Sequence, residues 1–104
     1  LNKQLGTKIL ASRPVIESAI DIHSRRLGFF HLKGKDKPLE VFEIRGTKDV
    51  VTQDEQHFVV QFETAVSAFE AGNKNEAKTQ FEHILTSCED GPTAYYLQQA
   101  SDQD

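Results

Sequence analysis

The 104-residue sequence contains one cysteine, no methionine, no tryptophan and no long apolar run. A single cysteine, Cys88, cannot form a disulfide within the chain, which excludes a disulfide-stabilised scaffold and favours a reducing compartment, the cytoplasm. No run of about 20 apolar residues and no apolar segment after a basic start is present, so we expect neither a membrane span nor a signal peptide. Because the sequence lacks methionine and begins at Leu1, we expect it to be a piece of a longer protein.

The charge balance is weakly acidic. Twelve Lys and Arg residues against 16 Asp and Glu residues give a formal net charge of −4. Such a field does not attract nucleic acid or an anionic membrane surface, so we expect no nucleic-acid partner and no membrane contact by this segment. The length suffices for one small hydrophobic core and is too short for two.

The first half of the chain has the pattern of strands with one short helix. Residues 8–11 predict a short buried strand, after which Ser12 and Pro14 have the positions of a cap and a first-turn proline. The helix that they open has a predicted apolar stripe of Val15, Ile16, Ala19 and Ile20. Strand-forming residues at 25–33 and 39–44, on either side of a Gly- and Pro-containing turn, predict a β-hairpin.

The second half has a helical period. Thr52 and Asn73 are each followed three positions later by Glu, which is the spacing of a capping box at a helix start. Gly72 separates the two predicted helices, and residues 94–98 predict a short third helix. The apolar faces of the two longer helices are predicted to consist of Phe58, Phe62, Ala65, Val66 and Phe69, and of Ala77, Phe81, Ile84 and Leu85.

These patterns predict an α+β fold in which a short strand, a helix and a β-hairpin precede an antiparallel helical hairpin. The hydrophobic period changes across residues 47–51. We therefore expect two parts, residues 1–46 and a linker with a helical-hairpin tail over residues 47–104.

Few side chains suggest chemistry. The four histidines are not at metal-ligand spacing, so we assign no metal to this chain. Cys88 follows Ile84 by four residues and is interpreted as a packed thiol. Arg25 and Arg26 are interpreted as solvated strand residues, and His31 as a surface histidine.

The hairpin turn contains Lys33, Lys35 and Lys37. An ammonium beside Gly34, where a ligand can approach the backbone closely, suits a phosphate. The alternative is a charged turn that is simply solvated. From the residues alone both interpretations stay open.

Three stretches carry a family resemblance: residues 1–12 before the predicted helix, Arg-Arg-Leu-Gly at 25–28 with Leu-Lys-Gly-Lys at 32–35, and Pro-Leu-Glu-Val-Phe-Glu-Ile at 38–44. Residues 1–46 resemble the C-terminal end of a class III adenylate/guanylate cyclase catalytic domain, which implies the last part of that family's ferredoxin-like sheet. The tail is similar in part to a tetratricopeptide unit, through Gly72 and the spacing of Ala77 and Phe81.

The resemblance implies an enzyme, a phosphorus–oxygen lyase that converts ATP or GTP to the 3′,5′-cyclic nucleotide and pyrophosphate in intracellular signalling. Lys33 matches the family's triphosphate-binding lysine. The metal-binding, purine-reading and transition-state residues are expected upstream of Leu1. The fragment is therefore expected to bind no cofactor and to be inactive alone, whereas the parent uses Mg²⁺ or Mn²⁺ and works as a homodimer.

A second hypothesis belongs to another class. The parent is then a degenerate cyclase-like protein, and this segment is a non-catalytic dimerisation or protein-interaction module. Both hypotheses place the segment in the cytoplasm, with room for an upstream sensor or membrane domain in the parent.

Overall fold

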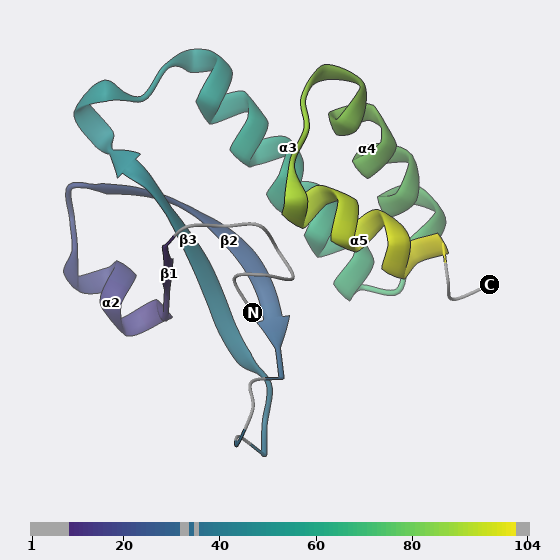
Figure 1. Cartoon of the computed structure of the whole chain (residues 1–104), viewed down its shortest axis with the longest axis horizontal. Helices are drawn as coiled ribbons and strands as arrows, with labels where there is room; N and C mark the ends of the chain where they lie inside the picture. Colours follow the sequence, from purple (N-terminus) through teal and green to yellow (C-terminus); the bar gives the residue numbers. More distant parts are fainter. Residues whose placement is uncertain (1–8, 32–33, 35, 102–104) are drawn as a thin grey trace.

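The computed structural model describes residues 9–31, 34 and 36–101 (Figure 1). Its elements follow the order β1 (Leu10–Ala11), α2 (Arg13–Ser18), β2 (Ile22–Phe30), β3 (Leu39–Thr47), the 3-10 turn η1 (Lys48–Val50), α3 (Gln53–Glu70), α4 (Lys74–Ser87) and α5 (Gly91–Ser101). The α+β prediction of a strand, helix and hairpin followed by a helical hairpin is confirmed. The short third helix is present as α5.

The three strands form an antiparallel sheet in the order β1-β3-β2. The β2–β3 hairpin runs from the pair Ile22–Thr47 to the pair Phe30–Leu39, so both strands extend further toward the base of the hairpin than predicted. Two register shifts interrupt the ladder, one after His23 and one between Arg26 and Gly28. Helix α2 lies near β1, whereas α3, α4 and α5 lie on the β2 side (Figure 1).

Helix α3 begins as its sequence predicts. The backbone N–H of Glu55 donates to the Thr52 hydroxyl at 3.1 Å. Helix α4 does not: the side chain of Asn73 makes no capping hydrogen bond, so the capping box predicted there is wrong. Gly72 has a φ of +91° and turns the chain sharply after α3. The backbone N–H of Asn73 then donates to the Ala68 carbonyl. In this turn Asn73 does not adopt the extended backbone conformation that a capping residue needs.

The hydrophobic core takes residues from the sheet and from the helices. Most of the predicted helical faces are buried in it, while Phe58 and Phe69 pack against it in part. Its buried members are Leu27, Phe30 and Val41 of the sheet, and Phe62, Ala65, Val66, Ala77, Phe81, Ile84 and Tyr96 of the helices. The division after residue 46 stays a prediction, and the two parts share this core in the folded chain.

The apolar stripe predicted for the first helix is wrong. Helix α2 ends at Ser18 and buries none of its residues, and the side chains of Val15 and Ile20 are 50% and 76% exposed. Ala19 leaves the helical conformation because the chain must turn here into β2, where Ile22 pairs with Thr47. A six-residue helix is thus ended by strand pairing. Over the described ranges, no helix has the length and apolar character that a membrane crossing requires.

Candidate functional site

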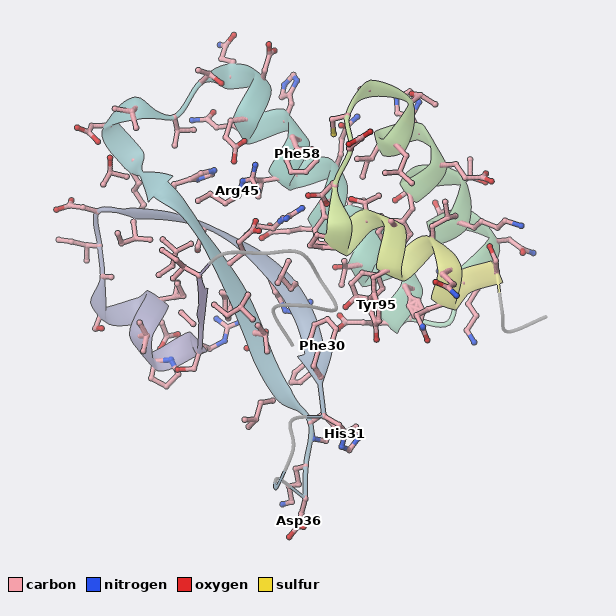
Figure 2. The ribbon with its side chains drawn as sticks, in the orientation of Figure 1. Phe30, His31, Asp36, Arg45, Phe58 and Tyr95 are labelled. Carbon is pink, nitrogen blue, oxygen red and sulfur yellow. The ribbon has the colours of Figure 1, made fainter. Side chains whose placement is uncertain are left out.

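The tip of the β2–β3 hairpin is the first candidate site. Lys33, the predicted triphosphate-binding residue, and Lys35 lie outside the described residues. The neighbouring residues His31, Gly34 and Asp36 are exposed, and His31 and Asp36 lie at the end of the hairpin far from the helices (Figure 2). His31 is thus a surface histidine, as predicted. Gly34 has a φ of +84°, and a Cβ built on it meets nothing within 4 Å, so the backbone at the tip is open to a ligand.

The middle of the hairpin is held by Arg25, whose side chain is 0% exposed. Its guanidinium donates from Nη2 to Glu43 Oε1 at 2.7 Å and from Nη1 to Asp90 Oδ2 at 2.8 Å. It also lies 4.4 Å from the ring centroid of Phe62 and 5.1 Å from that of Phe58. The interpretation of Arg25 as solvated is therefore wrong, because two carboxylates and two aromatic faces replace its hydration.

Asp90 joins this cluster to α5. Its carboxylate accepts hydrogen bonds from the backbone N–H of Thr93 at 3.1 Å and from the Thr93 hydroxyl at 2.6 Å, so it caps the helix. Burial by itself would raise the pKa of Asp90, but the hydrogen bonds and charge of Arg25 outweigh it and lower the pKa below its ordinary value. One carboxylate therefore fastens the start of α5 to β2.

A second contact fastens α5 further along β2. The hydroxyl of Tyr96 donates to the carbonyl of Leu27 beside the register shift at Gly28. A Cβ built on Gly28 would lie 2.1 Å from the Tyr96 oxygen, so only glycine leaves room for this contact. The ring of Tyr96 is parallel to that of Phe81 with centroids 5.4 Å apart. Burial raises the pKa of the Tyr96 phenol, which keeps it a neutral donor.

Carboxylates elsewhere around the sheet are also paired. Three of them are each shared by two basic groups: Glu40 by Arg13 and Arg26, Glu43 by Arg25 and Arg45, and Glu55 by Arg45 and His23. Hydrogen bonds from Arg13 and Arg26 outweigh desolvation and lower the pKa of Glu40 to about 2. These carboxylates are committed to structural ion pairs and are not free general bases.

A cleft of about 650 Å³ separates the first half of α3 from the end of α4. His57 and Cys88 both line it. Cys88 is exposed and extended, because α4 ends at Ser87, so the prediction of a packed thiol is wrong. Desolvation and the nearby Asp90 carboxylate raise the pKa of the Cys88 thiol, which favours its protonated form. Within the described part of the chain, no group of three His, Cys, Asp or Glu side chains could hold a metal ion.

Comparison of the chain with family models, with curated proteins and with solved structures finds no match. The assignment of a site therefore rests on the residues and their geometry. The middle of the hairpin carries paired charges that serve the fold, and its exposed tip is the part open to a ligand.

Proposed function

We propose that this chain is the C-terminal part of a class III adenylate or guanylate cyclase catalytic domain, followed by a helical tail. In the reaction, the ribose 3′-hydroxyl loses its proton and attacks the α-phosphorus of ATP or GTP, and pyrophosphate leaves. The observation that carries the proposal is the order of elements: β1, α2 and the β2–β3 hairpin follow as the resemblance predicts, with Lys-Gly-Lys at 33–35 in the connection between the two long strands.

In this proposal Lys33 binds the triphosphate. Its ammonium is a compact point charge that donates hydrogen bonds to phosphate oxygens. Gly34 beside it has open space where a side chain would stand, which supports close approach of a phosphate to the backbone. The charge on Lys33 then offsets negative charge on the departing pyrophosphate.

The remaining catalytic residues belong, by the resemblance, to sequence preceding Leu1. By the resemblance, Mg²⁺ or Mn²⁺ would be held by aspartates of the parent that precede Leu1. The proposal further includes a homodimeric parent in the cytoplasm, and a fragment that is inactive alone.

The direct test is cyclic nucleotide formation by the protein that contains this chain, assayed with ATP and with GTP in the presence of Mg²⁺ or Mn²⁺. The 104-residue chain alone serves as the control and is expected to form no product. Formation of cyclic AMP or cyclic GMP by the longer protein supports the proposal. No product in any of the four combinations contradicts it.

Lys33→Ala in the longer protein should lower kcat/KM about 10- to 150-fold, because a charged hydrogen bond to phosphate contributes about 1.5–3 kcal/mol. The matched control is Lys37→Ala, an exposed lysine four positions later in the sequence, which should change kcat/KM less than about twofold. Steady-state kinetics with each triphosphate measures both. Equal kinetics for Lys33→Ala and the parent would remove Lys33 from the site.

The alternative function is a non-catalytic dimerisation or interaction module in a degenerate cyclase-like protein. It is favoured by apolar side chains that stand exposed on the helical part, such as Val60. The sequence preceding Leu1 separates the two functions: metal-binding aspartates and an asparagine–arginine pair there indicate an enzyme, and their loss indicates the module.

A further inference from the structure

Acidic residues are concentrated in the helical part of the chain. From Gln53 to Asp90 there are eight Asp and Glu residues and two lysines, whereas the whole chain has 16 acidic and 12 basic residues. Four of the eight accept hydrogen bonds from β2 or β3: Glu55, Glu63, Glu70 and Asp90. The other four are exposed and make no ion pair with another described residue: Asp54, Glu76, Glu82 and Glu89. The helical part thus presents carboxylates that the fold itself does not use.

Two hollows between α3 and α4 adjoin each other. The first has a volume of about 390 Å³, and its walls are mainly carbon, from residues that include Val60, Thr64 and His83. The second is the cleft of about 650 Å³ beside the first half of α3. Gln61 and Ile84 line both hollows, so the two form one groove, the α3–α4 groove, in which an apolar stretch opens into a polar cleft.

Unused carboxylates lie toward both ends of the α3–α4 groove. Asp54 and Glu89 line the cleft at one end. Glu76 stands on α4 four residues before Gln80 of the apolar stretch, and therefore on the same side of that helix. Neither lysine of this region lines the groove, and Arg45, which lines the cleft, is already paired with two carboxylates. Negative charge without a partner thus flanks an apolar stretch.

We propose that the α3–α4 groove binds a basic amphipathic helix of another protein. The apolar side chains of the partner lie in the apolar stretch, and its Lys or Arg side chains face the carboxylates toward the two ends. Carboxylates only accept hydrogen bonds, whereas ammonium and guanidinium groups only donate them, so a cationic partner satisfies both sides. An acidic protein or a nucleic acid would oppose like charges here.

The length of the groove suits such a helix. At a rise of 1.5 Å per residue, Glu76 lies about 17 Å from Ser87, the last residue of α4. This distance corresponds to about three turns of a partner helix, enough for an apolar side chain in each turn and a cation at each end. The proposal names the class of partner for the interaction module, and it does not rest on cyclase activity.

Gln80 supplies an independent observation. It lines the apolar stretch, and its buried side-chain oxygen has no hydrogen-bond partner among the described residues. A buried carbonyl without a partner is costly, and the group that it lacks is a donor. Rotation of the amide toward the groove brings this oxygen within reach of a donor, and each cation of a basic helix carries several N–H donors.

The first test is binding of a synthetic peptide to the 104-residue chain, measured by fluorescence anisotropy. The probe has about 14 residues of Leu, Ala and Lys, a helix of about 21 Å with its leucines on one face. We expect a Kd below about 100 μM that rises between about 0.05 and 0.5 M salt. One control peptide has the same composition in scrambled order, and the other has Glu in place of Lys. Both should bind at least about 10-fold more weakly.

Variants of the chain then locate the contact. Thr64→Arg places a long cationic side chain in the apolar stretch and should raise Kd at least about 10-fold. The matched control is Ser67→Arg, which adds the same charge to the exposed surface of α3 outside the groove and should change Kd less than about threefold. Circular dichroism shows whether both variants remain folded.

A second pair of variants tests the carboxylates and does not depend on Thr64→Arg folding. Glu76→Gln combined with Glu89→Gln should raise Kd about fivefold, because each end of the groove loses a charge. Glu17→Gln combined with Asp36→Asn removes the same charge from exposed positions on α2 and the hairpin tip, and should change Kd less than about twofold.

Three results would overturn the proposal: no binding of the basic peptide, equal binding of the ordered and scrambled peptides, or equal effects of the groove variants and their controls. These measurements use no nucleotide. Peptide binding can therefore fail while cyclic nucleotide formation succeeds, and the reverse.

Discussion

The strands of the β2–β3 hairpin and its tip lie in opposite environments. In the middle of the strands, Arg25 is enclosed by carboxylates and aromatic rings, and nearer the tip Tyr96 sits against Gly28. Beyond the strands, Gly34 and Asp36 are exposed, and Asp36 lies far from the helices (Figure 2). The strands are thus held by the helical part, and the tip faces solvent.

This difference separates stability from ligand access. A buried arginine with two carboxylate partners is costly to disturb, so these strand residues serve the fold. An exposed turn lysine such as Lys37 contributes little to stability. The helical tail therefore holds the strands and leaves the described part of the tip open, and substitutions in the strands and at the tip should behave differently.

The largest effect is expected at Arg25. Arg25→Ala should lower the free energy of unfolding by about 3–5 kcal/mol, because it removes the cation that pairs with Asp90 and leaves Glu43 with Arg45 alone. Urea denaturation measures the change. The control Arg13→Ala removes a half-exposed arginine and should lower the free energy of unfolding far less. Equal costs at the two positions would contradict the comparison.

Gly28→Ala should be the next most harmful change, at about 2–3 kcal/mol, because it combines a positive φ with a clash against the Tyr96 hydroxyl. Gly46→Ala is the matched control. Gly46 also has a positive φ, of +145°, but a Cβ there meets nothing within 4 Å. Thermal unfolding should therefore give a larger loss for Gly28→Ala, part of which Tyr96→Phe restores. Equal losses for the two glycines would show that Tyr96 does not hold β2 at Gly28.

The fold was predictable from sequence where local patterns govern it. The hairpin and both long helices follow from alternation, helical period and the Thr52 cap, and the core faces follow from spacing. The early end of α2 at Ser18 was not, because pairing of Ile22 with Thr47 ends a helix that its own sequence would continue.

The buried ion pairs of Arg25 were the part that sequence reasoning missed. Arginine is a surface residue by composition, and its burial depends on Asp90, 65 positions away in the sequence. One signal for this arrangement was present in the sequence. Asp90 stands three residues before Thr93 with Pro92 between them, which is the pattern of a helix cap followed by a proline in the first turn. The same cap explains why Cys88 lies outside α4: the chain must leave that helix before Asp90 can start the next.

Acid should lower the free energy of unfolding by an amount between the effects of Gly28→Ala and Lys37→Ala. The pKa of Glu40 is lowered to about 2, so its stabilising effect is present above its ordinary pKa of 4.5 and is lost as pH falls toward 2. The loss should be on the order of 1–2 kcal/mol, reduced by the exposure of Arg13. Urea denaturation between pH 5 and pH 2 should give a steeper decline for the wild type than for Glu40→Gln. Parallel declines would place Glu40 outside the ion-pair network.

The smallest effect is expected at the tip. Lys37→Ala should change the free energy of unfolding by no more than about 0.5 kcal/mol. The side chain of Lys37 is exposed to water, so its removal eliminates few contacts within the protein. A loss above about 1 kcal/mol in urea denaturation would mean that the tip also serves the fold.

Amide hydrogen exchange across β2 and β3 tests the contrast between the strands and the tip most directly. We expect the amides that pair Arg25 with Glu43 to exchange only through global unfolding, those near Gly34 and Asp36 to exchange almost unprotected, and Arg25→Ala to remove protection in the middle of the strands. Equal protection along the whole hairpin, or protection in the middle of the strands that survives Arg25→Ala, would contradict the account.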